Sequence, residues 1–349
     1  MVQACRCWVA WGHQVDLLCA GFPGAAPEET IEGVRCIRGP NEYLFNWWAL
    51  GKIRELDKKK YDIIVEFISK VPCFLPWRIK STPLAVMIPH LFGKTAFIEL
   101  PWPMAAYAYA LEQPIPQVYR RCPFWALSNT TAADLVARDI PLKQIEVIYP
   151  GVDEGLLHPP SRAKKTSFPS ILYIGRLKKY KRIDLIITAT AKLLPRFPDL
   201  HVYLVGKGDY EPELRRQVAA LGVEKAVEFT GFVSKERRRE LLQAVWLGVQ
   251  ASTIEGWGLG VFEAGACGTP TIATNVPGLS ESVRDGETGI LVPSGDAEAL
   301  ATQIAKVLSD AALREKLGAT AREWVSRFSW EEMARKSLKF LENAAGQRP

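Results

Sequence analysis

The sequence lacks any apolar run long enough to cross a bilayer. Its longest candidate, residues 104–111, is interrupted by prolines on both sides, whereas a membrane-spanning helix needs about 20 apolar residues in a row. Internal repeats and low-complexity tracts are absent as well. The lack of a membrane-spanning run argues against an integral membrane protein.

Cysteine occurs in a pattern that argues against disulfides and against zinc. The seven cysteines, an odd number, are Cys5, Cys7, Cys19, Cys36, Cys73, Cys122 and Cys267. Most of them lie in apolar segments rather than in loop clusters, which is typical of small buried side chains in a reducing cytosol. Cys5-x-Cys7 has no second cysteine pair. We therefore expect a cytoplasmic protein without a metal site.

Neither half of the chain has an excess of charge of one sign. The net charge of +6 divides into 16 basic minus 14 acidic residues for residues 1–150 and 28 minus 24 for the remainder. A domain that binds nucleic acid concentrates its positive charge, so we expect no nucleic-acid partner. With 349 residues, 48% of them apolar, the chain has room for two α/β domains of ordinary size.

In the first half of the chain, short apolar segments alternate with stretches of helical character. The expected strands are residues 15–19, 34–37, 63–68, 84–88, 125–127 and 145–148. This alternation is the βαβ pattern of a mostly parallel sheet. Ligands bind at the carboxyl ends of such strands, and His90 follows the strand at 84–88. A histidine there is most often structural, so a structural and a functional role both stay open.

A further βα unit begins at residue 171, where an apolar strand runs into Gly175-Arg176-Leu177 and then Lys181. Glycine at the end of a strand lets a ligand approach the backbone, and cationic side chains before a helix neutralise an anion. Arg176 and Lys181 therefore form a candidate diphosphate site. The turn at residues 206–208 is not a dinucleotide fingerprint, because the third glycine is absent.

The stretch 251–275 combines glycines and carboxylates in a strand, loop, helix, strand unit. Three glycines occupy alternate positions of the loop: Gly256, Gly258 and Gly260. Without Cβ atoms, these positions let backbone N–H groups approach an anion, and the helix expected from Leu259 adds its positive end. Glu255 and Glu263 bracket the loop with the spacing Glu-x7-Glu.

These motifs resemble those of the retaining glycosyltransferases of family 4. In that family Glu-x7-Glu is followed by Glu-Ala-x-Ala-x-Gly-x-Pro and Gly-x-x-Glu, which this chain has at residues 263–270 and 278–281. The resemblance runs from residue 11 to about residue 341 and is strongest from 175 to 293. It implies the α/β fold called GT-B, in which two Rossmann-like domains face each other across a cleft.

The resemblance also implies the domain boundaries. We expect an acceptor-side domain at residues 1–155, a nucleotide-sugar-binding domain at 156–328, and a C-terminal helix at 329–345 that crosses back to the first domain. In the family, a segment similar to residues 11–15 leads into the second strand. The first domain is therefore expected to lack its first strand, and we expect the chain as written to bind nucleotide weakly and to transfer sugar slowly or not at all.

The implied activity is transfer of a hexose from a nucleotide-diphosphate sugar to a hydroxyl of a glycan or lipid-linked acceptor, in polysaccharide biosynthesis. The nucleotide sugar is a substrate, and no bound cofactor is expected. Arg176 and Lys181 are expected to stabilise the departing diphosphate, Glu255 to hold sugar hydroxyls, Glu263 to hold the ribose, and His90 to face the sugar. The other implied donor-binding residues, largely through their backbone, are Gly175, Phe232, Gly256, Trp257, Gly258, Leu259 and Gly260. Because no Asp-x-Asp occurs in the chain, we expect no metal requirement.

Residues 93–121 are rich in aromatic residues and proline and contain Arg120-Arg121. They fit a surface loop with an ordinary helix, an acceptor platform, or a patch that rests on the inner face of a membrane.

Two other functions also stay open for the whole chain. One is a GT-B sugar-nucleotide epimerase, against which the Gly-Arg-x4-Lys and Glu-x7-Glu motifs argue, and the other is an inactive fragment that only binds nucleotide.

Overall fold

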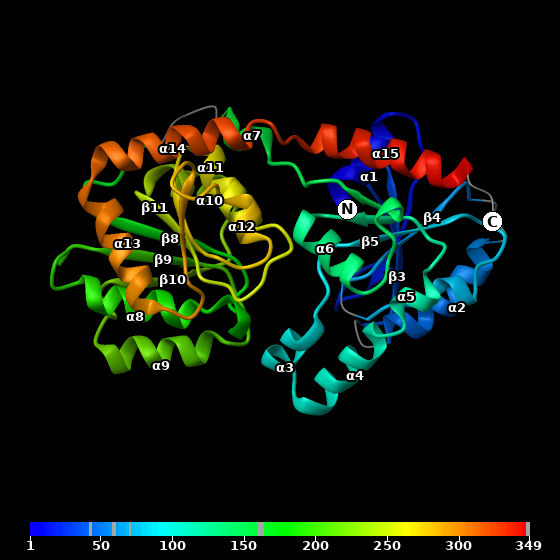
Figure 1. Ribbon diagram of the computed structural model, residues 1–349, viewed down its shortest axis with the longest axis horizontal. Helices are drawn as coiled ribbons and strands as arrows, with labels where there is room; N and C mark the ends of the chain where they lie inside the picture. The colour runs from blue at the N-terminus through cyan, green and yellow to red at the C-terminus, as the bar shows by residue number, and fades with distance from the viewer. Residues whose placement is uncertain (42–43, 58–60, 70, 159–163, 347–349) are drawn as a thin grey trace. The chain divides into compact units, whose positions relative to one another are not determined.

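The computed structural model describes residues 1–41, 44–57, 61–69, 71–158 and 164–346. The chain divides into two compact units. The first contains Met1–Gly151 together with the C-terminal helix α15 (Trp330–Gly346), and the second is Val152–Ser329 (Figure 1). The division lies at 151/152 and 329/330, a few residues from the boundaries expected from the sequence.

The first unit contains two sheets. One has the order β1-β3-β2, in which β1 (Asp16–Ala20) is parallel to β3 (Val34–Gly39) and β2 (Glu28–Ile31) is antiparallel to it. The other has the order β4-β5-β6-β7 and is entirely parallel. Its strands are Ile64–Phe67, Leu84–Ile88, Phe124–Ala126 and Ile145–Val147. Within the described residues β1 and β4 each end a sheet, so each has one edge without a ladder.

Strand β5 shows why this sheet needs helices on both faces. Ala85 and Met87 pack with α1 (Val2–Ala10) and α15, whereas Val86 and Ile88 pack with α5 (Ile115–Val118) and α6 (Asn129–Ala137). All four side chains are buried. Successive residues of a strand point to opposite faces, so an apolar run of this kind requires a covered sheet.

Helix α15 completes the core of the first unit, although it follows the whole second unit in sequence. Its residues Met333, Ala334, Phe340 and Leu341 belong to the same buried cluster as Trp8 of α1. The indole Nε1 of Trp8 donates a hydrogen bond of 2.9 Å to the carbonyl oxygen of Ala334.

The remaining helices of the first unit are α2 (Phe45–Asp57), α3 (Ala96–Glu99) and α4 (Trp102–Glu112). Short 3-10 turns cover Leu75–Trp77, Gly93–Thr95 and Leu142–Gln144. Helix α4 buries two small residues, Ala105 and Ala108, and exposes large ones, Trp102, Met104 and Tyr107. In the described part of the chain, no helix is both long and apolar enough to cross a membrane.

The second unit is built on one six-stranded parallel sheet with the order β10-β9-β8-β11-β12-β13. In chain order the strands are Ser170–Ile174, His201–Val205, Val227–Gly231, Leu247–Gln250, Thr271–Thr274 and Gly289–Val292. From β8 the strands proceed outward to β10, and from β11 they proceed outward in the other direction. The strand order therefore reverses between β8 and β11, and ligands of open α/β sheets bind at such a point.

Helices cover both faces of this sheet (Figure 1). They are α7 (Glu154–Leu157), α8 (Ile183–Leu193), α9 (Glu211–Leu221), α10 (Lys235–Ala244), α11 (Leu259–Ala266), α12 (Leu279–Ser282), α13 (Ala297–Ser309) and α14 (Ala311–Val325), with a 3-10 turn at Lys179–Lys181. A large buried cluster joins strands and helices and includes Ile171, Tyr173 and Ile186, which have no exposed surface.

Candidate functional site

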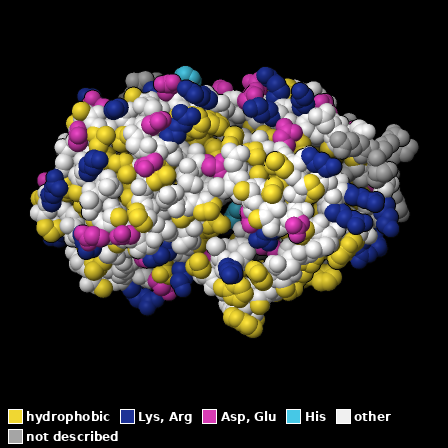
Figure 2. Space-filling view, viewed as in Figure 1, with side chains coloured by type: hydrophobic (Ala, Val, Ile, Leu, Met, Phe, Trp, Pro, Cys, Tyr) yellow, Lys and Arg dark blue, Asp and Glu magenta, His cyan; other side chains and the backbone are white. Residues whose placement is uncertain are grey.

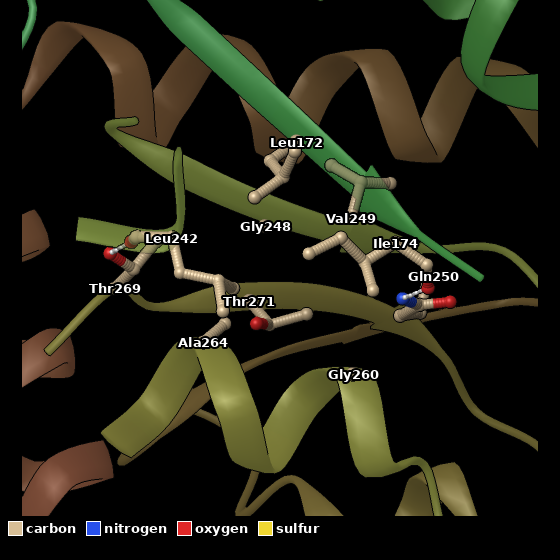
Figure 3. Close-up of a pocket in the computed structure, with 10 residues that line it drawn as sticks. All are labelled: Leu172, Ile174, Leu242, Gly248, Val249, Gln250, Gly260, Ala264, Thr269 and Thr271. Carbon is tan, nitrogen blue, oxygen red and sulfur yellow. Dashed lines mark hydrogen bonds between the residues drawn. The ribbon is translucent and has the colours of Figure 1, made fainter. Parts of the chain in front are cut away.

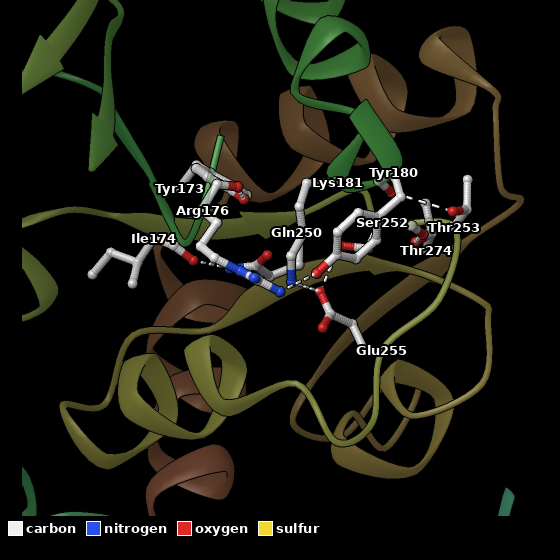
Figure 4. A network of polar contacts seen from close by, with 10 residues as sticks. All are labelled: Tyr173, Ile174, Arg176, Tyr180, Lys181, Gln250, Ser252, Thr253, Glu255 and Thr274. Atoms are coloured by element: carbon white, nitrogen blue, oxygen red, sulfur yellow. Dashed lines mark hydrogen bonds and ion pairs between the residues drawn. The ribbon is translucent and has the colours of Figure 1, made fainter. Parts of the chain in front are cut away.

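The candidate site lies where β8 and β11 end. Residues 175–181 follow β8 and residues 251–258 follow β11, and the two strands are hydrogen-bonded neighbours. Their carboxyl ends therefore bring together side chains that are far apart in sequence. Figure 4 shows Arg176, Tyr180, Lys181 and Glu255 in one polar network.

Glycines allow three strand ends to meet at this edge. The amide of Gly175 donates to the carbonyl of Val205 at 3.0 Å, and the amide of Gly206 donates to that of Gly231 at 2.9 Å. Gly206 has a φ of +139°, and a Cβ atom there would lie 1.9 Å from the carbonyl oxygen of Gly175. Only glycine fits at position 206. The close approach of the two backbones therefore sets the position of the Arg176 backbone, which follows Gly175.

Two cations lie at this edge. The guanidinium Nη2 of Arg176 donates to the Tyr180 hydroxyl at 3.2 Å, and the Tyr173 hydroxyl donates to the Arg176 carbonyl oxygen at 2.9 Å. The Lys181 ammonium forms an ion pair with Glu255. Arg176 is exposed, whereas the side chain of Lys181 keeps only 12% of its surface exposed. The structure thus brings together Arg176, Lys181 and Glu255, as the sequence motifs predict.

Glu255 is held from two sides. Its Oε1 accepts a hydrogen bond of 2.6 Å from Ser252 Oγ in addition to the Lys181 ion pair. Its backbone amide donates to the Pro277 carbonyl at 3.1 Å. Gly278 packs so tightly here that a Cβ atom would lie 2.1 Å from the Glu255 carbonyl oxygen. The carboxylate is therefore fixed before any ligand binds.

Glu263 lies on α11, one turn after the start of the helix, and forms an ion pair with Arg238 of α10. Burial raises the pKa of the Glu263 carboxyl group, and the positive charge of Arg238 opposes that rise. The structure thus shows Glu263 in contact with a cation from another helix, which the sequence motif does not predict.

The loop between Glu255 and Glu263 presents backbone groups rather than side chains. Helix α11 begins at Leu259 after Gly258, which has a φ of +79°. The first amides of a helix have no carbonyl partner within it and attract anions. The Trp257 ring is buried, with its centroid 5.0 Å from that of Phe262. Of the predicted donor-binding residues in this loop, Trp257 can therefore contribute only its backbone, as can the glycines Gly256 and Gly260.

Two predicted residues are not members of this network. Phe232, in the loop between β10 and α10, has 85% of its surface exposed, so its ring is free to pack on a planar ligand. His90 follows β5 in the first unit, and its ring centroid lies 5.5 Å from that of Phe92.

A small internal cavity lies beneath the site, between β8, β11, β12 and α11 (Figure 3). Its lining is mostly apolar and includes Leu172, Val249 and Ala264. At about 10 Å³ it is roughly the size of one water molecule. A cavity of this size cannot hold a sugar.

Metal ligands do not gather at this site. Across residues 1–41, 44–57, 61–69, 71–158 and 164–346, no group of three or more His, Cys, Asp or Glu side chains is arranged to hold a metal ion. Arg176, Lys181 and the amides at the start of α11 contribute positive charge at this site.

Three residues that contact the predicted ones are not predicted from the sequence: Tyr180, Ser252 and Arg238. Tyr180 lies inside the motif between Arg176 and Lys181, and this position could have identified it. Arg238 stands in the run Arg237-Arg238-Arg239, where nothing in the sequence distinguishes it from solvated neighbours.

Comparison with known proteins gives two family matches that together cover most of the chain. Residues 1–156 match the model described as Glycosyltransferase Family 4, and residues 157–324 match Glycosyl transferases group 1. A D-inositol 3-phosphate glycosyltransferase from a Nocardioides strain is 34% identical over 226 residues, which are 58% of this chain and 49% of that protein. The chain thus spans about half the length of the curated relatives it matches first.

Solved structures confirm the predicted GT-B fold class. A sucrose-phosphate synthase from Thermosynechococcus elongatus matches with a TM-score of 0.79 and 24% identity, over 98% of this chain and 91% of the other. HepE from Anabaena, solved in complex with UDP-glucose, matches with a TM-score of 0.70 and 20% identity, over 89% and 86% of the two chains. At these identities the similarity shows the fold alone.

Proposed function

Since the chain belongs to glycosyltransferase family 4, we propose that it transfers a hexose from a nucleoside-diphosphate sugar to an acceptor hydroxyl with retention of the anomeric configuration. The observation that carries the proposal is the cluster of Arg176, Lys181 and Glu255 at the point where the strand order of the second unit reverses. Two cations and the start of α11 suit a diphosphate, and a fixed carboxylate suits sugar hydroxyls.

We propose that the Lys181 ammonium changes its partner when the donor binds. It now pairs with Glu255. A diphosphate that binds beside Arg176 offers Lys181 a second anion, and Glu255 then becomes available to accept hydrogen bonds from the sugar. Negative charge grows on the diphosphate as the glycosidic bond breaks, so Arg176, Lys181 and the amides after Glu255 stabilise the transition state more than the bound donor.

Retention requires that the new bond forms on the face from which the leaving group departs. In the reaction we propose, the acceptor oxygen attacks the anomeric carbon on that face while the bond from that carbon to the diphosphate oxygen breaks. The departing diphosphate takes the acceptor proton, so no protein nucleophile is needed. Glu263 and Phe232 are proposed to hold the ribose and the base, and HepE, solved with UDP-glucose, supports a nucleotide sugar as the donor.

A donor panel tests the function. The protein is titrated with UDP-glucose, UDP-N-acetylglucosamine, ADP-glucose and GDP-mannose by calorimetry, and turnover is followed by proton NMR with simple glycans or lipid-linked sugars as acceptors. We expect one donor to bind and its sugar to be transferred with the same anomeric coupling constant. Epimerised sugar without an acceptor would indicate the epimerase, and binding without turnover would indicate an inactive fragment.

The same assay in excess EDTA should lose no activity. If EDTA abolished transfer and added magnesium restored it, the proposed leaving-group chemistry would be contradicted.

We further propose that α3 and α4 rest on the cytoplasmic face of a membrane where a lipid-linked acceptor is presented. Figure 2 shows apolar side chains gathered over these helices. The exposed large residues are Phe97, Ile98, Trp102, Met104 and Tyr107. Lys94, Arg120 and Arg121 are exposed in the same part of the chain and complement anionic headgroups. All seven cysteines are free, as a cytoplasmic protein requires.

Replacing Trp102 by alanine should weaken sedimentation with phosphatidylglycerol vesicles roughly tenfold, because the ring leaves water when the helix binds. Trp47 on α2 is the matched control, since both tryptophans are 73% exposed. Trp47→Ala should bind vesicles like the wild type. Equal losses in the two variants, or no binding by the wild-type protein, would contradict the membrane proposal and leave the donor chemistry untouched.

A further inference from the structure

Tyr180 contacts both cations of the candidate site. Its hydroxyl accepts a hydrogen bond of 3.2 Å from Arg176 Nη2, and its ring centroid lies 4.9 Å from Lys181 Nζ. The first contact is a charge-assisted hydrogen bond, and the second is a cation–π interaction. Figure 4 shows the ring beside the two cationic side chains and above Glu255.

The backbone of Tyr180 is tied to the neighbouring strand end. Its carbonyl oxygen accepts hydrogen bonds from the Thr253 amide at 2.8 Å and from Thr253 Oγ1 at 3.2 Å. Thr253 lies between Ser252 and Glu255, so one residue after β8 connects the cationic turn to the loop that holds the carboxylate. The ring of Tyr180 therefore has a fixed base from which to orient both side chains.

The chemistry of these contacts suits a role in positioning. Two cations at one site repel each other, and both must remain charged to bind a diphosphate. A phenol hydroxyl and an aromatic ring attract cations without cancelling their charge. We propose that Tyr180 is a positioning residue that orients the Arg176 guanidinium and the Lys181 ammonium toward the donor diphosphate, an inference that rests on the proposed function.

Two substitutions separate the contacts. Tyr180→Phe removes the hydroxyl and keeps the ring, and Tyr180→Leu removes both. We expect the first to lower kcat about threefold to tenfold and the second roughly tenfold to a hundredfold, with smaller changes in the KM for the donor. Tyr203→Phe on β9 is the control, because the Tyr203 ring contacts His201 at a centroid distance of 4.5 Å and lies outside the network.

Phosphorus NMR of bound UDP, GDP or ADP measures the surroundings of the diphosphate directly. A variant that only lowers the stability of the protein would leave the chemical shift of the bound nucleotide unchanged. The β-phosphorus resonance should shift in Tyr180→Phe and Tyr180→Leu in the same direction as in Lys181→Ala, at unchanged binding stoichiometry, and stay in place in Tyr203→Phe. Wild-type kcat and an unmoved resonance in both Tyr180 variants would overturn the positioning role while the transferase function stands. If the wild-type protein binds no nucleoside diphosphate, the proposed function fails and the role of Tyr180 with it.

Discussion

Replacing Lys181 by alanine is expected to lower kcat by about 10²–10³-fold, with a smaller effect on donor affinity. The physical reason is the charge that grows on the diphosphate as the sugar leaves, which a partly buried ammonium stabilises more strongly than an exposed one. The side chain of Lys181 keeps 12% of its surface exposed. Release of nucleoside diphosphate at saturating donor measures the effect, and Arg176→Ala should act in the same direction.

Lys179 provides the matched control. It lies two residues earlier in the same turn, but its side chain is exposed. Lys179→Ala should therefore turn over within about twofold of the wild type. Near-wild-type kcat in both Lys181→Ala and Arg176→Ala would show that these cations do not assist the leaving group.

The ion pair with Glu255 allows a sharper version of this experiment. Lys181→Ala removes a cation and also leaves a carboxylate without its partner beside the diphosphate. If part of the loss comes from that uncovered negative charge, Lys181→Ala/Glu255→Gln should lose less activity than the sum of the single variants predicts. Strict additivity would show that the two side chains act independently.

Substituting alanine for Gly206 is expected to destabilise the second unit by about 3–4 kcal/mol and to abolish donor binding. Two effects add, because alanine is strained at a φ of +139° and its Cβ would lie 1.9 Å from the Gly175 carbonyl oxygen. The clash falls on backbone, so relief requires that the turn before Arg176 moves. Urea unfolding followed by circular dichroism, together with calorimetry of nucleotide binding, measures the two losses.

A substitution at Gly222 is the control that separates backbone strain at a positive φ from the steric clash of an added Cβ atom. It has a φ of +64° at the end of α9, and a Cβ atom there would meet nothing within 4 Å. Gly222→Ala should therefore cost about 1 kcal/mol and leave nucleotide binding unchanged. If Gly206→Ala were no more destabilised than Gly222→Ala, the close packing of the strand ends would not matter for the site.

The sequence predicts strands from their apolar side chains and misses one strand whose residues are all exposed. The sequence correctly predicts strand β5, because its apolar residues alternate between two layers of helices. All four residues of β2, Glu28–Ile31, are exposed, so no apolar alternation marks that strand. Helix α4 could not be assigned a buried face either, because the residues it buries are two alanines and Glu112, whereas Trp102 is exposed.

Several residues of the candidate site could be proposed from the sequence, but their contacts could not. Glycine spacing and charge point to Arg176, Lys181 and Glu255, since each stands where a strand ends. The pairing of Lys181 with Glu255 joins residues 74 positions apart, and it depends on β8 and β11 being neighbours. The partner of Glu263 depends in the same way on how α10 packs beside α11.

The packing of α15 against α1 has a consequence for the order in which the protein folds during synthesis. The ribosome finishes the whole second unit, 178 residues from 152 to 329, before it makes the helix that completes the first core. At bacterial and eukaryotic elongation rates this is a delay of roughly 10–40 s. During that interval the surface around Trp8 that α15 later covers is open to water, so the unit that begins first is the one that matures last and the one that depends more on chaperones.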